Sequence, residues 1–155
     1  MSNAIIDIQN LHFSYNGQPV LIDVNLSVQS GDFIVMIGPN GGGKTTLIKL
    51  MLGLLEADSG IIRIFGKPPK GVSHRIGYVP QDVHINRNFP VSVLDVVLMG
   101  RLRPGGGWSR PLREDRVAAR EAVKLVEMEK FCYHRIGELS GGLKQRVWVA
   151  RAVGT

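Results

Sequence analysis

The apolar residues of the N-terminal part of the chain come in short runs separated by glycine, asparagine and other turn residues. Short runs of this kind, rich in isoleucine, valine and leucine, are typical of β-strands. Asn16-Gly17 separates two of the runs, and this dipeptide is typical of a tight turn between antiparallel strands. Gly60 and Gly66 bound a further run. The pattern predicts strands at residues 5–8, 11–15, 20–28 and 61–65.

From about residue 82 the spacing of apolar residues becomes helical. Ser92 and Asp95 resemble the two ends of a capping box, which predicts a helix running to about Met99. The glycine-rich segment at residues 103–107 interrupts this pattern. The first helix of this region is therefore expected to be short.

A longer helix is expected from Arg113 to Met128, followed by a stop at Gly137 and another helix that begins at Ser140. The candidate core residues of the long helix are Val117, Leu125, Val126 and Met128.

Between the two regions, an apolar run at residues 32–37 leads into a glycine-rich turn. Residues 38–45 read Gly-Pro-Asn-Gly-Gly-Gly-Lys-Thr and fit the pattern G-x-x-x-x-G-K-[ST] of a phosphate-binding loop. The flanking runs predict a buried strand at residues 32–38 and a helix at residues 45–53 that ends at Gly53. Strand, turn and helix form the context in which this motif binds a nucleotide.

The residue types of the loop suit the phosphates of a nucleotide. Backbone N–H groups can wrap the phosphates, and the helix N-terminus adds partial positive charge. We expect Lys44 to reach the β- and γ-phosphates and the Thr45 hydroxyl to bind Mg²⁺. The alternative is a glycine-rich turn without a ligand, which the match over residues 38–45 and the correct flanks disfavour. The expected nucleotide-binding residues are Gly38, Asn40, Gly41, Gly42, Gly43, Lys44, Thr45 and Thr46, with Lys44 also catalytic.

A second motif, Leu-Ser-Gly-Gly-Leu-Lys-Gln-Arg, occupies residues 139–146. Ser140 can cap a helix, and Gly141 and Gly142 keep its first turn free of side chains, so that a phosphate could approach closely. Alone, the motif indicates only a helix cap. After a phosphate loop it resembles the signature motif of the ATP-binding cassette (ABC) family, and the resemblance covers essentially the whole chain.

The resemblance implies an α/β fold: a P-loop NTPase core with an antiparallel β subdomain and a helical subdomain. It implies that Tyr15 stacks on adenine, although an ordinary strand aromatic would look the same. It also implies that Gln81 is catalytic and lies near Mg²⁺ and the attacking water, although Pro80-Gln81 by itself is only a strand end. Ser140, Gly141, Gly142 and Leu143 are expected to act in trans, on the nucleotide of a second subunit.

Two departures from the family pattern stand out. Leu143 replaces the glutamine usual at the fifth position of the signature, which removes one polar contact. The sequence also ends at Thr155, before the family's apolar strand with its Asp-Glu pair, and two earlier look-alikes ending at Asp7 and Asp23 lack the following glutamate.

The missing pair leads us to expect an incomplete ABC ATPase domain that is inactive alone. Its expected parts are residues 1–81 (nucleotide-binding core), 82–138 (helical subdomain) and 139–155 (signature helix). Without the missing strand, the apolar faces of Ile34, Met36 and Leu47 should lose their cover and favour self-association.

Composition adds a few constraints. At 155 residues, 44% of them hydrophobic, the chain has the size of one globular domain. It has no apolar stretch of membrane-spanning length and no apparent secretory signal. The single cysteine, Cys132, excludes an internal disulfide, fits a reducing cytosol and is expected to pack as an apolar residue.

The net charge is +6, and many of the cations lie in the region of residues 101–120. A basic stretch can suit nucleic acid or anionic lipid, but acidic residues dilute it and the aromatic interleaving typical of nucleic-acid binding is lacking. A solvated face is the preferred interpretation, and no nucleic-acid partner is expected.

The resemblance predicts the ATP-binding subunit of an ABC transporter, with ATP and Mg²⁺ as cofactors. Its expected partners are a second ATP-binding subunit in a head-to-tail dimer and membrane permease subunits, at the cytoplasmic face of the membrane. Residues 75–101 resemble the zinc and manganese importers, so a divalent metal is the expected cargo. The alternatives are an ABC ATPase that acts on nucleic acid or in translation, and a nucleotide-binding fragment without turnover.

Overall fold

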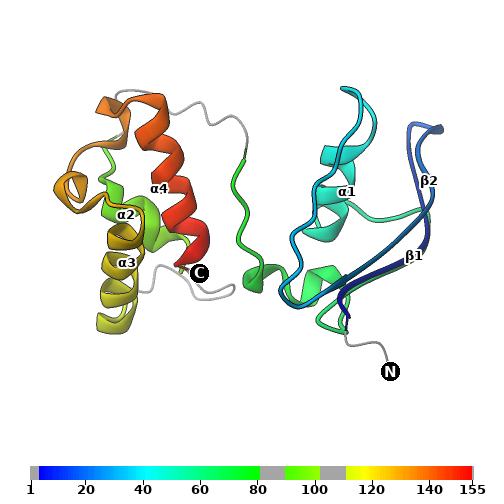
Figure 1. The fold of residues 1–155 in the computed structure, drawn as a ribbon, viewed down its shortest axis with the longest axis horizontal. Helices are drawn as coiled ribbons and strands as arrows, with labels where there is room; N and C mark the ends of the chain where they lie inside the picture. The colour runs from blue at the N-terminus through cyan, green and yellow to red at the C-terminus, as the bar shows by residue number, and fades with distance from the viewer. Residues whose placement is uncertain (1–3, 81–89, 102–110, 155) are drawn as a thin grey trace. The chain divides into compact units, whose positions relative to one another are not determined.

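A computed structural model describes residues 4–80, 90–101 and 111–154. The chain forms two compact units, Met1–Ser73 and His74–Thr155 (Figure 1). Gln81 and the interruption expected at residues 103–107 lie outside the described residues. No helix among the described residues is both long enough and apolar enough to cross a bilayer.

The first unit is built on a three-stranded antiparallel sheet. Its strands are β1 (Ala4–Tyr15), β2 (Gln18–Gln29) and β3 (Ser59–Ile64), in the order β2-β1-β3. Ile8 lies at the centre, opposite Leu26 of β2 and Ile62 of β3. The predicted Asn16-Gly17 turn joins β1 to β2, and both residues have the positive φ that such a turn requires.

The strands predicted at residues 5–8 and 11–15 are one strand, β1, interrupted by a bulge near Asn10. Asn10 has a φ of 47°, and its side-chain amide donates to the Asp23 carboxylate over 3.0 Å. These hydrogen bonds, from Asn10 first and then from Asn25, lower the pKa of Asp23. The Asp23 carboxylate is therefore held by hydrogen bonds within the β1–β2 hairpin.

Helix α1 (Lys44–Met51) packs its apolar side on the sheet. Leu52 caps the helix, and Gly53 follows with a φ of 70°, close to the predicted end. The core of this unit consists of Ile8, Leu11, Phe13, Leu21, Leu47 and Leu50.

The strand predicted at residues 32–38 is absent from the described structure. Phe33 and Ile37 are 89% and 91% exposed, and Ile34 and Met36 are exposed as expected. A β-strand exists only when a neighbour accepts and donates its backbone hydrogen bonds, and the described residues offer this segment no partner strand. Leu47, in contrast, stays buried against the sheet, so the expectation that it would lose its cover was wrong.

In its described residues the second unit is a bundle of three α-helices, α2 (Val93–Met99), α3 (Arg113–Leu125) and α4 (Gly141–Val153). Short 3₁₀ turns occur in this unit at Glu129–Phe131 and Ile136–Glu138, in the first unit at Pro69–Gly71, and at Ser73–Arg75 across the division between the units. Residues from all three helices form one core with Met128, Ile136 and Leu139. Cys132 is buried in this core, and burial raises the pKa of its thiol, as befits an apolar packing residue.

The core face of α3 differs from the prediction. Val117 and Leu125 are 56% and 73% exposed, whereas Ala119, Ala122 and Val123 are buried. The small alanines allow α2 and α4 to approach closely, and this approach sets which stripe of α3 faces inward. Val126 and Met128 do contact the core, but they lie beyond the end of the helix at Leu125.

The two compact units are divided at another residue than the three predicted parts, whose bounds stay a prediction. Residues 76–80 form no strand, and Gly77 lies so close to Ala152 of α4 that a Cβ would come within 2.6 Å of its carbonyl oxygen. The signature helix α4 shares the core of α2 and α3. Residues 74–80 and the signature helix therefore belong to the same unit as the helical subdomain.

The predicted capping box of α2 is confirmed and gives a stability test. Asp95 N–H donates to Ser92 Oγ over 3.2 Å, and Ser92 N–H donates to the Asp95 carboxylate over 3.1 Å. We expect Ser92→Ala to lower the free energy of unfolding by about 1 kcal/mol. Urea unfolding followed by circular dichroism measures the change. Ser140→Ala is the matched control, because Ser140 also caps a helix but its side chain makes no capping hydrogen bond; an equal loss in both variants would contradict the prediction.

Candidate nucleotide site and signature surface

The phosphate loop lies in the first unit and enters α1 through left-handed glycines. Gly41 and Gly43 have φ values of 84° and 82°. A Cβ on Gly43 would lie 2.7 Å from Leu21 Cδ2 and 3.2 Å from the Val20 carbonyl oxygen. Glycine is therefore required at this position both by conformation and by the packing of the loop against β2.

Lys44 turns back over the loop. Its Nζ donates hydrogen bonds to the carbonyl oxygens of Gly38 and Pro39, over 2.7 and 2.6 Å. The ammonium group is thus held above the loop at its N-terminal end. Phosphate oxygens are stronger acceptors than carbonyls, so they can replace these two partners without a large movement of the side chain.

The N-terminus of α1 has the donors that an anion needs. Its N-cap is Gly43, which has no side chain to cap the helix, and the first turn contains no acidic residue. Leu47 N–H donates to the Gly43 carbonyl oxygen over 2.8 Å, so the N–H groups of Lys44, Thr45 and Thr46 precede the first bond of the helix. Thr45 is exposed, whereas Thr46 is buried at 8% exposure.

Tyr15 belongs to the same unit as the loop. Its ring is 43% exposed and packs edge-on against Phe13, with 4.8 Å between ring centroids. Phe13 lies opposite Leu21 in the sheet, and Leu21 contacts the loop at Gly43. Tyr15 is therefore connected to the phosphate loop through two packed residues and offers an exposed aromatic surface.

The signature motif opens α4 in the second unit. Ser140 is the N-cap, as predicted, but its hydroxyl makes no capping hydrogen bond. Gly141 and Gly142 are exposed, with open space where a Cβ would lie. The helix N-terminus, the serine hydroxyl and the bare first turn together present a surface that can accept an anion.

Leu143, the departure from the family pattern, packs against the core of the second unit. Its side chain is partly buried, so it contributes to holding the signature helix on the bundle. Sequence reasoning considered only the lost polar contact and missed this packing role. The apolar side chain of Leu143 was the feature of the sequence that could have indicated this packing.

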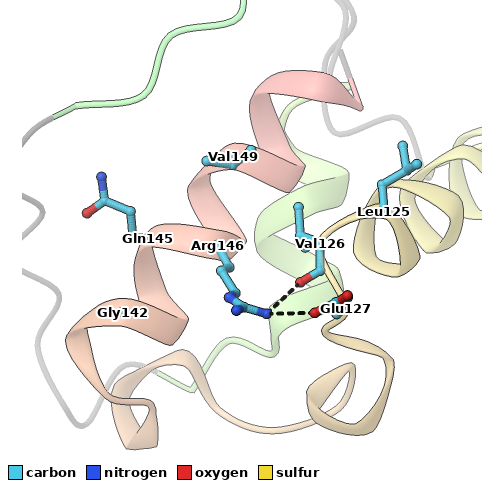
Figure 2. A pocket seen from close by; sticks show the side chains of 7 residues that line it. All are labelled: Leu125, Val126, Glu127, Gly142, Gln145, Arg146 and Val149. Carbon is cyan, nitrogen blue, oxygen red and sulfur yellow. Dashed lines mark hydrogen bonds and ion pairs between the residues drawn. The ribbon is translucent and has the colours of Figure 1, made fainter.

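A groove of about 500 Å³ lies beside the signature glycines and was not predicted (Figure 2). The Arg146 side chain lines the groove, and its Nη1 donates to the Val126 carbonyl oxygen over 3.4 Å and to the Glu127 carboxylate over 3.3 Å. These bonds join the end of α3 to the first turns of α4. The groove is lined by Leu125, Val126, Glu127, Gly142, Gln145, Arg146 and Val149.

Comparison with known proteins matches residues 21–155 to the family model described as "ABC transporter". The chain is 46% identical to a manganese transport system ATP-binding protein of Bacillus subtilis over 96% of its length and 59% of the relative's. It is 43% identical to a zinc transport system ATP-binding protein of Treponema pallidum, covering 96% of this chain and 56% of that protein.

Solved structures with a similar fold are also ATP-binding cassettes of ABC transporters. A nucleotide-free ATP-binding cassette from an ABC transporter superposes with a TM-score of 0.81 at 28% identity, covering 97% of this chain and 65% of that one. A dimeric bacterial ABC transporter cassette gives a TM-score of 0.77 at 28% identity, covering 96% and 69%. The chain thus spans somewhat more than half the length of the curated relatives quoted. Phosphate loop, signature helix and the family match over residues 21–155 together establish that this chain belongs to the ABC transporter family.

Proposed function

We propose that the chain is part of the ATP-binding subunit of an ABC transporter and binds ATP through its phosphate loop. The observation that carries this proposal is the conformation of the loop. Lys44 Nζ is held over the loop by two carbonyl oxygens, and the N-terminus of α1 is free of any side-chain cap. Both features suit a polyphosphate, which would accept hydrogen bonds from the ammonium and from the first N–H groups of the helix.

The donors at this site also fit Mg²⁺. Magnesium is usually bound by few protein oxygens together with phosphates and water, and the exposed Thr45 hydroxyl at the start of α1 is such an oxygen. When bound, the ion would neutralise charge on the phosphate oxygens. Lys44 would hold the terminal phosphates, the loop N–H groups would orient them, and Tyr15 would support the adenine. Gln81 keeps its expected catalytic role, in a segment outside the described residues.

The signature surface is proposed to act on a second subunit. Ser140, Gly141 and Gly142 are exposed, the Ser140 side chain makes no capping hydrogen bond, and open space lies where a Cβ on either glycine would be. A phosphate bound by another subunit could therefore reach the N-terminus of α4. A structure among the similar ones is described as a dimeric ABC transporter cassette, which supports pairing of two subunits.

For the 155 residues alone we propose nucleotide binding without turnover. The sequence contains no apolar strand ending in Asp-Glu after the phosphate loop, and the family uses this pair to support the metal and to polarise water. Hydrolysis would then require a chain that also carries this pair.

The proposed cargo is a divalent transition metal, handled by permease subunits at the inner face of the membrane. The similar proteins from Bacillus subtilis and Treponema pallidum are described as manganese and zinc transport system proteins. The resemblance of residues 75–101 to this branch supports the same substrate class, although residues 81–89 of this segment lie outside the description.

A growth experiment tests the transport function. Deletion of the gene should impair growth only when zinc or manganese is scarce, because other uptake routes suffice when metal is plentiful. A plasmid copy of the intact subunit should restore growth, and a copy carrying Lys44→Ala should not. Rescue by an added sugar or amino acid, with no response to either metal, would overturn the proposed cargo.

A further inference from the structure

One face of helix α3 collects exposed cations. Arg113, Arg116, Arg120 and Lys124 are all exposed, and the helical repeat places them along a single stripe, which we call the basic stripe. The neighbouring side of the helix, with Ala119, Ala122 and Val123, is buried in the core. The packing of the second unit therefore forces the basic stripe outward.

No member of the basic stripe forms an ion pair among the described residues. The described ion pairs are Lys70–Glu56, Arg101–Asp115 and Arg146–Glu127, and none includes a member of the stripe. Arg116, Arg120 and Lys124 follow each other at intervals of four residues, so like charges are neighbours and repel. The exposed carboxylates of α3, Glu114 and Glu121, lie beside the stripe; Glu121 precedes Lys124 by three residues, but no ion pair between them is among the described pairs.

Arg101, in contrast to the cations of the stripe, is paired within the fold. It is partly buried, and it donates to the Asp115 carboxylate over 2.9 Å and to the Gly154 carbonyl oxygen over 2.7 Å. The expectation of a solvated face was therefore wrong for Arg101, which ties α3 to the end of α4. The fold uses this cation internally and leaves those of the stripe facing outward.

Apolar and aromatic groups accompany the stripe. The exposed Val117 lies at the edge of the stripe, on the side of Glu114 and Glu121. The exposed Tyr133 accepts a hydrogen bond from Arg120 Nη2 over 3.0 Å. Long basic side chains beside an aliphatic residue and a tyrosine suit the boundary of a bilayer, where cations meet headgroups and apolar groups lie slightly deeper. A nucleic acid would gain little from Val117, and Tyr133 alone does not provide the series of aromatic rings on which successive bases stack.

We propose that the basic stripe of α3 docks on an anionic membrane surface. The complementary partner is a layer of acidic phospholipid headgroups. Each basic residue near such a surface strengthens binding by about fivefold. This contact needs neither ATP nor a permease, so it goes beyond the transport function proposed above. It would hold the second unit against the bilayer beside a permease.

Vesicle sedimentation tests the proposal without nucleotide. The chain is mixed with vesicles of phosphatidylcholine and phosphatidylglycerol in a ratio of 7:3, and with pure phosphatidylcholine vesicles, at low salt. We expect binding only to the acidic vesicles, and Arg113→Gln/Arg116→Gln/Arg120→Gln should weaken it by roughly 100-fold. The matched control, Lys49→Gln/Arg63→Gln/Lys67→Gln, removes the same charge from exposed positions of the first unit and should weaken it by less than about fivefold.

The outcomes are distinct. A large loss confined to the stripe variant supports the proposal, and an equal loss in both variants overturns it in favour of net charge alone. Absence of binding by the unsubstituted chain, or stripe-dependent binding to RNA or DNA but not to vesicles, also overturns it. If circular dichroism shows that the glutamine variant misfolds, the variant Arg113→Lys/Arg116→Lys/Arg120→Lys is tested in its place. It should bind acidic vesicles like the unsubstituted chain and lose this binding in 0.5 M salt. Failure of either expectation overturns the proposal.

Discussion

Replacing Lys44 by alanine should lower the affinity for ATP by about ten- to a hundredfold. A charge-assisted contact is worth about 1.5–3 kcal/mol, and the Nζ group is already held over the loop by the carbonyl oxygens of Gly38 and Pro39. The substitution removes both the cation that meets the phosphates and the link that spans the loop. Isothermal titration calorimetry with ATP and Mg²⁺ measures the change.

Lys49→Ala is the matched control. Lys49 lies in the last turn of α1 and is exposed, so its loss removes the same charge from the same helix without touching the loop. We expect the affinity of the Lys49→Ala variant for ATP to stay within about twofold of that of the unsubstituted chain. Equal affinities for the Lys44→Ala variant and the unsubstituted chain would rule out the loop as the site. Phosphate release at about 0.1 per second or more by the 155 residues alone, lost on Lys44→Ala, would refute the proposed lack of turnover.

The second large effect is expected at the signature motif. Ser140→Arg should abolish ATP hydrolysis in a subunit that also carries the Asp-Glu pair, while ATP affinity of the monomer stays near normal. Gly141 and Gly142 leave an open first turn, and a long charged side chain at the N-cap would occupy the space that a second subunit's phosphate needs. Turnover assays and calorimetry on the same preparation separate the two effects.

Ser140→Ala provides the comparison. Because the Ser140 hydroxyl makes no capping hydrogen bond, alanine should leave α4 folded and reduce hydrolysis far less than arginine does. If Ser140→Arg instead abolished ATP binding by the monomer, the signature would belong to the nucleotide site of its own chain. The proposed action in trans would then be wrong.

Much of the local structure of the candidate nucleotide site was predictable because its determinants are local. The positive φ values of Gly41 and Gly43, the start of α1 and the N-cap at Ser140 follow from glycine, lysine and serine at fixed spacing. The groove at Arg146 was missed, since its contact with Glu127 depends on how two helices meet.

The sequence by itself determined the features that form within a few residues of each other. The Asn16-Gly17 turn, the capping box at Ser92 and the glycine conformations of the phosphate loop all depend on backbone preferences and short-range hydrogen bonds. These interactions are the same whatever the rest of the chain does, so a local pattern suffices to predict them.

Tertiary structure alone decided the features that need a distant partner. Residues 32–38 have the composition of a strand, yet they form none because no neighbouring strand among the described residues supplies hydrogen bonds. Val117 and Leu125 were exposed and the alanines of α3 buried because close helix packing favours small side chains at the contact. Leu143 packs against the core of the second unit. Whether a residue is buried depends on what lies opposite it in the fold, and the linear pattern of residues does not contain that information.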